Sequence, residues 1–329
     1  MTFFEKIRFS LAPYWSWRRI YTANEKASSD LNKYYWLDGN SYNIIQGKWK
    51  VENGISLGLY THSLDAPLVQ RVNITGLCEY GFALAELDRE AEQHVIVQFI
   101  ADSILTESFK GKFDFSFWLP GYSYDSQCHF IDGMGQGQML SLITRYNLLY
   151  PDKANNDVLL RISNSYLVDF DHPRGFVDRR DEAIIMEEYS QPRPCSHVLN
   201  GWIYSVTGLC DYVVYCDRVG ITDPLLGEKK ELVRRSLDTL EKSLSKYDLG
   251  YWSTYDQPNV KENICSIHYQ VAHIAQLKGL FNMTGRKAFL QYSNKFLSQY
   301  RNPFFRLLAL FNKVVVSNLV RKGRFFRVK

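Results

Sequence analysis

The chain has 329 residues, of which 46% are hydrophobic and 22% are charged. This length permits a large buried core, and the composition is that of a globular protein, which excludes a disordered chain. The net charge of +4 is too small to indicate nucleic-acid binding, so we expect no nucleic-acid partner. Aromatic residues make up 15% of the chain, which weakly favours a carbohydrate ligand, although a tyrosine-rich core explains the same composition.

The six cysteines show neither a C-x-x-C pair nor a regular spacing, so we expect reduced thiols rather than a disulfide framework. His268 and His273 lack the spacing and the acidic neighbours of a metal site, and we therefore expect no metal. Residues 1–20 contain no long apolar core, which argues against a secretory signal. These features predict a cytoplasmic protein.

Residues 1–75 are predicted to form an amino-terminal arm with a small β portion. This prediction rests on the glycines that separate short extended runs, which are Gly39, Gly47, Gly54 and Gly58. From residue 81 to residue 107, apolar residues recur at helical spacing and predict one long helix or two short ones. The FDFSFWLPGY segment that follows is predicted to be extended.

Asp132 precedes the sequence GMGQGQMLSLITRYNLLY, which predicts a helix entered through a glycine-rich turn. The glycines do not form a phosphate-binding loop, because the segment has neither a Walker lysine nor a G-x-G-x-x-G motif. Residues 152–170 are predicted to be helical, and GFVDRRDEAIIMEEY is predicted to form a hairpin. Further helices are expected at residues 198–219, 224–246, 263–282 and 285–300.

Pairs of helices joined by loops predict a mainly α protein, in which helical hairpins form an incomplete α/α barrel behind the small amino-terminal β portion. We assign residues 76–302 to this barrel and residues 303–329 to a basic amphipathic tail. In such barrels the ligand cavity lies at one end, where helix termini and loops converge. No strict repeat is visible, which excludes a regular solenoid.

Three segments combine tyrosines with ionisable groups close to predicted helix starts. A single tyrosine or histidine on an apolar helix is usually a satisfied core residue, but three such clusters are harder to explain in that way. The clusters are Glu187, Glu188 and Tyr189 with Asn200 and Tyr204, then Tyr255 and Asp256, then Tyr269 and His273.

Four motifs resemble one known family in order and in spacing. They are GMGQGQMLSLITRY, EEY followed by VLNGWIYSVTGLCD, YDLGYWSTYD and YQVAHIAQL. Over residues 76–300 the chain resembles the carboxy-terminal catalytic domain of the D-glucuronyl C5-epimerases. These enzymes convert glucuronyl units of heparan-type polymers to iduronyl units. The resemblance implies an α/α-barrel domain, a heparosan-like acidic polysaccharide as substrate, no cofactor and a homodimer.

The resemblance also implies a catalytic set of one glutamate and three tyrosines, which falls on Glu188, Tyr189, Tyr255 and Tyr269. The residues expected to bind the substrate are Gln138, Arg180, Asn200, Tyr204, Asp256 and His273. The chain departs from the family pattern in a gap before Asn200 that is one residue longer, in a shorter amino-terminal β portion and at three residues. Ser190 replaces a proline, Gln257 follows Asp256 where the family continues towards an arginine, and Gln270 replaces the first histidine of Y-H-x-x-H.

The reaction itself needs two acid-base groups. Inversion at C5 of a uronic acid removes a proton beside a carboxylate from one face of the ring and returns a proton to the other. We expect Glu188 and Tyr269 to be this opposed pair, with Tyr189 and Tyr255 orienting groups or relaying protons. A carboxylate with a pKa of about 4 accepts a proton at neutral pH, whereas a tyrosine base needs its pKa lowered by about 3.

The cations nearest in sequence for lowering a tyrosine pKa, or for neutralising the substrate carboxylate, are Arg179, Arg180 and Arg193. His273 is a further candidate for the substrate carboxylate.

Three alternatives share this set of residues. A polysaccharide lyase begins with the same C5 abstraction and then expels the C4 leaving group. A non-catalytic glycan-binding subunit of a polysaccharide synthesis complex retains the aromatic cavity without catalysis. A hydrolase would use Glu187 or Glu188 together with Asp256.

The tail from Arg301 to Lys329 holds eight basic residues and no acidic residue, interleaved with apolar ones. It carries too many charges to span a bilayer. The pattern is typical of a segment that binds an anionic membrane surface, a partner or an acidic polymer. We expect peripheral association with the inner membrane, where such polymers are assembled.

Overall fold

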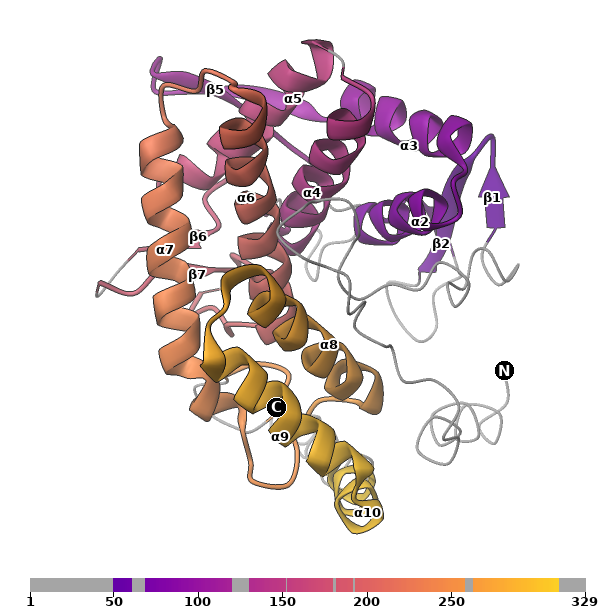
Figure 1. Ribbon diagram of the computed structural model, residues 1–329, viewed down its shortest axis with the longest axis vertical. Helices are drawn as coiled ribbons and strands as arrows, with labels where there is room; N and C mark the ends of the chain where they lie inside the picture. Colours follow the sequence, from indigo (N-terminus) through magenta and orange to yellow (C-terminus); the bar gives the residue numbers. More distant parts are fainter. Residues whose placement is uncertain are drawn as a thin grey trace, which may run out of the picture.

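The computed structural model describes residues 50–60, 69–119, 130–151, 153–179, 182–191, 193–257 and 263–313. Helices dominate this part of the chain, which confirms the prediction of a mainly α protein (Figure 1). The helices are α2 (Ile74–Glu86), α3 (Glu90–Ser103), α4 (Gly133–Leu149), α5 (Lys153–Asn164), α6 (Leu199–Val219), α7 (Leu226–Ser243), α8 (Ile267–Thr284), α9 (Lys287–Arg301) and α10 (Pro303–Phe311). Closure of these helices into a barrel stays a prediction.

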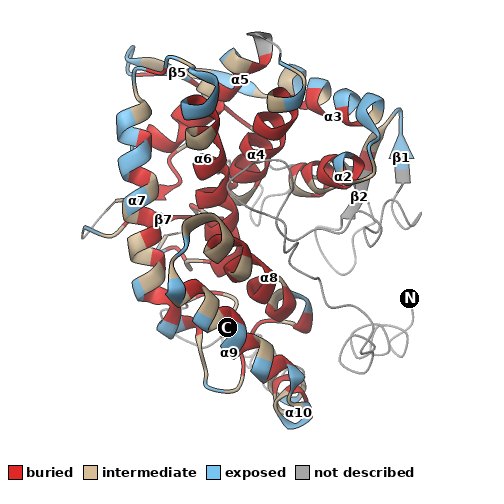
Figure 2. Cartoon of the chain, viewed as in Figure 1, coloured by how far each residue is buried: buried red, intermediate tan, exposed pale blue. Residues whose placement is uncertain are grey.

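Helices α4 and α6 form the centre of the molecule, and both are buried over most of their length (Figure 2). They cross at Gly137 and Gly208 with almost no space between their backbones. A Cβ atom on Gly208 would lie 2.1 Å from the Gly137 carbonyl oxygen, and one on Gly137 would lie 2.3 Å from the Tyr204 carbonyl oxygen. The glycines of GMGQGQ therefore serve close helix packing, which only residues without a side chain permit.

The start of α4 is fixed by Asp132, whose carboxylate accepts hydrogen bonds from the backbone amides of Met134 at 2.9 Å and Gly135 at 3.2 Å. This is the usual N-cap arrangement, in which an acidic side chain satisfies amides that have no partner within the helix. Gly133 packs against the backbone of Glu187, where a Cβ atom would lie 2.2 Å from the carbonyl oxygen. The first turn of α4 is thereby held against the chain that leads into α6.

A buried ion pair joins α4 to α6 beyond their crossing. The guanidinium of Arg145 donates to both carboxylate oxygens of Asp211 at 3.0 Å, and Ser141 donates to the same carboxylate at 2.7 Å. Asp211 is fully buried, so these bonds compensate for the loss of its hydration. The pair therefore fixes the register of the two central helices.

The remaining helices surround this pair. Helix α2 packs on α4 and α3, helix α7 packs on α6, and α8 joins α6 to the outer helix α9, which carries α10. Lys229 lies in the first turn of α7, and its buried ammonium donates to Asp223, Ser163 and Asn164, each at 2.7 Å. This network ties α7 to the end of α5.

The strands are short, and in the described part of the chain they form three separate antiparallel sheets. A three-stranded antiparallel sheet contains β1 (Lys50–Glu52), β2 (Ile55–Tyr60) and β3 (Val69–Arg71). A hairpin pairs β4 (Leu105–Phe109) with β5 (Phe113–Phe117), and a second one pairs β6 (Val177–Asp178) with β7 (Ile185–Met186). The predicted small β portion and the predicted hairpin in GFVDRRDEAIIMEEY are confirmed.

Several predicted boundaries differ from the structure. The stretch at residues 81–107, predicted as one long helix or two short ones, contains two helices, the first of which, α2, already begins at Ile74. Its last residues, from Leu105 onwards, belong to strand β4. The predicted helix at residues 152–170 ends at Asn164 and is followed by a 3-10 turn at Ser165–Leu167. Part of the expected tail is helix α10, while residues 314–329 lie outside the described residues. No helix in the described ranges is both long and apolar enough to cross a membrane.

Candidate functional site

The candidate site is built on the segment between β7 and α6, which carries two consecutive buried glutamates. The backbone amide of Glu187 donates to the Phe176 carbonyl oxygen at 2.8 Å, which continues the pairing of the β6–β7 hairpin. The carboxylate of Glu187 forms an ion pair with the imidazole of His197. Glu187 is thus engaged in holding the segment in place, while the next residue, Glu188, turns towards the tyrosines.

Glu188 is buried, with 1% of its surface exposed. The Tyr255 hydroxyl donates to its Oε1 atom at 3.3 Å, while Oε2 has no hydrogen-bond partner among the described residues. Burial, followed by the negative charge of Asp132, raises the pKa of Glu188 to about 8, against the opposing hydrogen bonds of Tyr189 and Tyr255. The ordinary carboxylate pKa of about 4 therefore does not apply to Glu188. Once ionised, Glu188 is a stronger base than an ordinary carboxylate.

The start of α6 leaves no room beside Glu188. A Cβ atom on Gly201 would lie 2.4 Å from both Cβ and Oε2 of Glu188. The carboxyl group therefore lies directly on the backbone of the first turn of α6. Glycine at this position is what permits that contact.

The other three predicted catalytic residues lie in the same cluster. The rings of Tyr255 and Tyr269 meet edge to face with centroids 4.7 Å apart, and a hydrogen bond between their hydroxyls contributes to the raised pKa of Tyr255. Tyr189 hydrogen-bonds Glu188 and packs edge to face on Phe130 with centroids 5.8 Å apart. The structure thus brings Glu188, Tyr189, Tyr255 and Tyr269 together from the segment before α6, the loop before α8 and α8 itself.

The described cations do not lower the pKa of Tyr255. Burial and then the charge of Glu188 raise that pKa, so Tyr255 is a neutral phenol. Arg179 donates to the Tyr166 carbonyl oxygen, and Arg193 pairs with Asp171 at 2.8 Å. Arg179 and Arg193, the cations nearest in sequence among the described residues, are therefore not among the groups that set the pKa of Tyr255.

Three of the predicted substrate-binding residues lie along the crossing of α4 and α6. Asn200 donates to the sulfur of Met134 at 3.5 Å, and its side-chain oxygen has no partner among the described residues. Gln138, one turn further along α4 than Met134, is fully buried, and neither of its side-chain polar atoms has a described partner. The Tyr204 hydroxyl donates to Glu79 of α2 at 3.3 Å. Buried polar groups of this kind usually have partners, so their presence here favours a polar ligand.

The other three predicted substrate-binding residues are placed differently. Asp256 follows Tyr255 and accepts a hydrogen bond from Asn263 at 3.2 Å. His273 is fully buried against Ser253 at 2.9 Å, and burial lowers its pKa to about 3. A neutral histidine does not supply a positive charge to a substrate carboxylate, which argues against that role for His273. Arg180 lies outside the described residues.

Sequence reasoning missed Asp132 as part of the site. Its carboxyl group is buried, burial raises its pKa to about 7, and its charge acts on Glu188. The signal was present, because an aspartate before a glycine-rich helix start is a typical N-cap. What the sequence did not show is that the same turn of α4 packs on the backbone next to Glu188.

Gln270, which departs from the family pattern, has a structural role. Its amide oxygen accepts from the Ser253 backbone amide at 3.0 Å and from the Ser253 hydroxyl at 2.7 Å. Its amide nitrogen donates to the Phe296 carbonyl oxygen at 3.1 Å. The residue therefore fixes the loop that carries Tyr255 onto helices α8 and α9.

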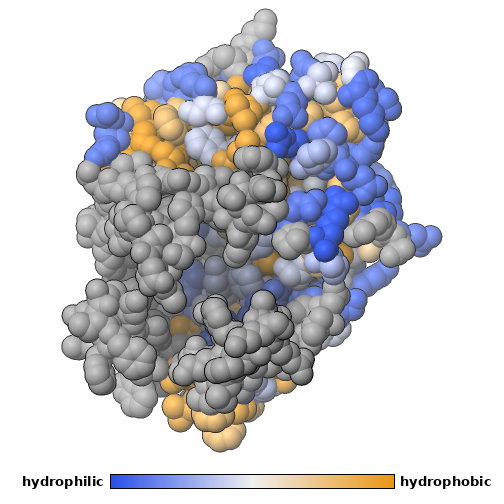
Figure 3. All heavy atoms as spheres, turned by 180° about the vertical axis from the view of Figure 1, so that it is seen from behind, coloured by the Kyte–Doolittle hydropathy of each residue, from blue (hydrophilic) through white to orange (hydrophobic). Residues whose placement is uncertain are grey.

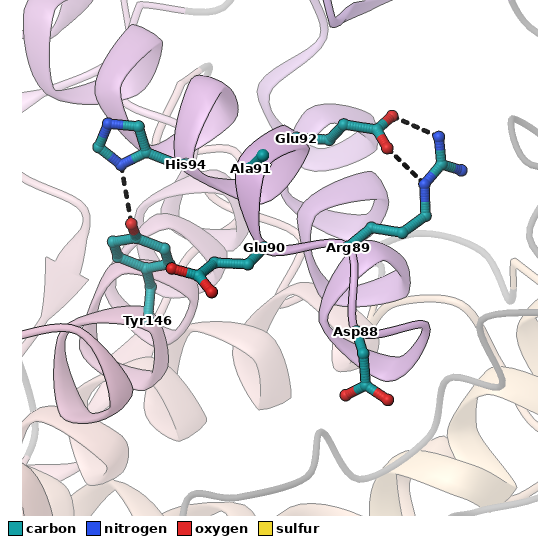
Figure 4. A pocket seen from close by; sticks show the side chains of 7 residues that line it. All are labelled: Asp88, Arg89, Glu90, Ala91, Glu92, His94 and Tyr146. Carbon is teal, nitrogen blue, oxygen red and sulfur yellow. Dashed lines mark hydrogen bonds and ion pairs between the residues drawn. The ribbon is translucent and has the colours of Figure 1, made fainter.

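A separate open pocket of about 710 Å³ lies at the start of α3 (Figure 4). Arg89 is paired with Glu92, and Nδ1 of His94 lies 2.7 Å from the hydroxyl of Tyr146. None of the predicted site residues lines this pocket. Among the described residues, no group of three or more His, Cys, Asp or Glu side chains is placed to hold a metal ion.

The fold and the site together define a mainly helical protein in which a buried carboxyl group contacts a cluster of phenols. The sequence profile of the D-glucuronyl C5-epimerase C-terminus matches residues 107–298, and the chain belongs to this family. The matched range includes the four predicted catalytic residues. An uncharacterized protein of Methanocaldococcus jannaschii is 32% identical over 108 residues, which cover 33% of this chain and 31% of that protein. The chain therefore aligns with about a third of the length of this relative.

Proposed function

We propose that this chain is a uronyl C5-epimerase, which converts D-glucuronyl to L-iduronyl units in an acidic, heparosan-like polysaccharide. The observation that carries the proposal is the contact of the buried Glu188 carboxyl group with Tyr255, which in turn contacts Tyr269. This set contains one group that accepts a proton and two that donate protons. It therefore matches a reaction that removes one proton and returns another.

In the proposed reaction, the Glu188 carboxylate removes the C5 proton and the Tyr269 hydroxyl donates a proton to the opposite face of the ring. A raised carboxyl pKa favours this role, because general bases work best when their pKa lies near the working pH. The step leaves Glu188 protonated and Tyr269 as a phenolate.

Tyr255 supplies the return path for the proton. It donates to Glu188 at 3.3 Å and hydrogen-bonds Tyr269, so it connects the two groups whose protonation has changed. One proton passes from Glu188 to Tyr255 while Tyr255 gives its own proton to Tyr269. The transfer restores the starting state with no net change of protons, and no cofactor takes part in it.

Gln138 and Asn200 are proposed to bind the hydroxyl groups of the sugar, because both side chains carry polar atoms that have no hydrogen-bond partner among the described residues. Tyr204 extends this surface towards α2 through its bond to Glu79. Asp256 would border the reacting sugar from the loop after Tyr255. Burial raises the pKa of its carboxyl group, against the opposing hydrogen bond from Asn263.

A lyase is the nearest alternative, because it begins with the same abstraction by Glu188. The two reactions give different products. An epimerase incorporates solvent deuterium at C5 and leaves the polymer intact, whereas a lyase gives an unsaturated product that absorbs in the ultraviolet. A glycan-binding subunit would show neither result.

Incubation with heparosan in deuterated water, followed by NMR, tests the residue assignment. Glu188→Gln and Tyr269→Phe are each expected to abolish deuterium incorporation at C5. Tyr292→Phe on α9 is the matched control, because Tyr292 lies outside the cluster and packs on Phe296. Retained exchange in the double variant of Glu188 and Tyr269 would contradict the assignment.

A further inference from the structure

Helix α10 has one face that packs on the body of the protein. Ala309 is fully buried, and the guanidinium of Arg306 lies 5.6 Å from the ring centroid of Tyr300 on α9. Phe305 contacts the ring of Tyr251, with centroids 6.4 Å apart. Beyond the helix, Asn312 donates to the Tyr251 hydroxyl at 2.9 Å. These contacts fix which side of α10 faces outwards.

The outward face of α10 is apolar. Phe304, Leu307 and Phe311 are exposed by 67%, 55% and 57%. Their spacing of three and four residues places them on one side of the helix, so they form a continuous stripe. In Figure 3 hydrophobic residues form the lower tip of the molecule, where α10 lies in Figure 1. Large apolar side chains grouped in this way usually mark a contact surface.

The sequence around this stripe is positively charged. Residues 301–329 contain eight lysines and arginines and no acidic residue. An apolar helix face combined with basic residues complements a surface that is apolar inside and anionic outside, which is the structure of a membrane with acidic headgroups. Each basic residue near such a surface adds to the attraction.

We propose that the α10 stripe of Phe304, Leu307 and Phe311 docks on an anionic lipid surface. A second copy of the chain fits the stripe less well, because pairing would bring two basic segments together. The stripe has three side chains on a nine-residue helix, which is small beside the area of about 800 Å² per partner in a stable complex. The docked protein would bind at the membrane surface and would not span the bilayer.

Sedimentation of the full chain with lipid vesicles tests this proposal. The protein is expected to bind vesicles with about 30% phosphatidylglycerol and not vesicles of phosphatidylcholine alone, and added salt is expected to weaken binding. Replacing Phe304, Leu307 and Phe311 together by serine is expected to lower the partition coefficient about a thousandfold, since each inserted side chain contributes roughly a factor of ten.

The control is Leu149→Ser, which removes a side chain of similar exposure, 55%, from the end of α4. It is expected to leave vesicle binding unchanged. Phe304→Ser alone provides a milder test, because Phe304 is the most exposed of the three and its loss leaves the buried face of α10 intact.

Three results would overturn the proposal. The first is no binding to anionic vesicles at low salt, and the second is binding of the triple variant equal to that of the unmodified chain. The third is a dimer in gel filtration that the triple variant loses, which would assign the stripe to a second copy. Vesicle binding does not depend on epimerisation, so the test stands apart from the proposed reaction.

Discussion

The contact between Gly201 and Glu188 predicts that a single added methyl group will disable the site without unfolding the protein. In Gly201→Ala the new Cβ atom would lie 2.4 Å from Cβ and Oε2 of Glu188 and 2.9 Å from its Cγ. Ordinary contacts of this kind begin at about 3.4 Å, so the glutamate must move by roughly 1 Å. A displacement of ~1 Å at a reacting group reduces a rate by about a hundredfold.

The stability of this variant should change much less than its activity. Alanine is favoured over glycine in a helix by up to about 1 kcal/mol, which partly offsets the ~1–3 kcal/mol of overpacking. We therefore expect the rate of deuterium incorporation at C5 to fall about a hundredfold while the free energy of unfolding, measured with urea, changes by less than about 3 kcal/mol.

Gly227→Ala is the matched control for this experiment. Gly227 also lies in the first turn of a helix, α7, and a Cβ atom there meets nothing within 4 Å. This variant is expected to keep its activity and to gain slightly in stability. Full exchange activity in Gly201→Ala would show that the reaction does not require Glu188 to lie against α6.

The remaining predictions concern a neighbouring charge and the central ion pair. Asp132→Asn keeps an N-cap acceptor for α4 but removes a negative charge that raises the pKa of Glu188. The pH at which exchange activity rises, about 8 in the unmodified protein, should therefore shift to lower values. An unchanged pH profile would contradict this coupling. Arg145→Met leaves the buried Asp211 without its cationic partner and should lower the free energy of unfolding by about 3–5 kcal/mol. Arg234→Met, whose ion pairs are exposed, should lower it much less. Equal effects of the two variants in urea titrations would show that burial of the central pair does not matter.

Most helices were predictable because their apolar residues recur at helical spacing and their ends carry clear signals. Gly220 and Gly285 end α6 and α8 in the left-handed conformation that favours glycine, with φ of 74° and 68°. The strand β4 was missed because Leu105 continues the apolar spacing of α3, and only pairing with β5 determines its conformation. Local pattern therefore predicts helices better than it predicts short paired strands.

The site was predictable in its residue types and less so in its electrostatics. The motifs identified Glu188, Tyr255 and Tyr269, which the fold brings into contact. The raised pKa of Glu188 and the neutrality of His273 follow from burial, which depends on tertiary packing and leaves no mark in the local sequence. The glycines of GMGQGQ are visible in the sequence, but their role requires the partner helix α6.

Deuterium incorporation at C5 of heparosan by the unmodified protein tests the central proposal most directly. We expect NMR to show deuterium at C5, iduronyl units in the product and an intact chain with no new ultraviolet absorbance. Incorporation should require no added metal or cofactor. Failure of the unmodified protein to introduce deuterium into glucuronyl or iduronyl units, or release of an unsaturated product, would contradict the proposed epimerase reaction.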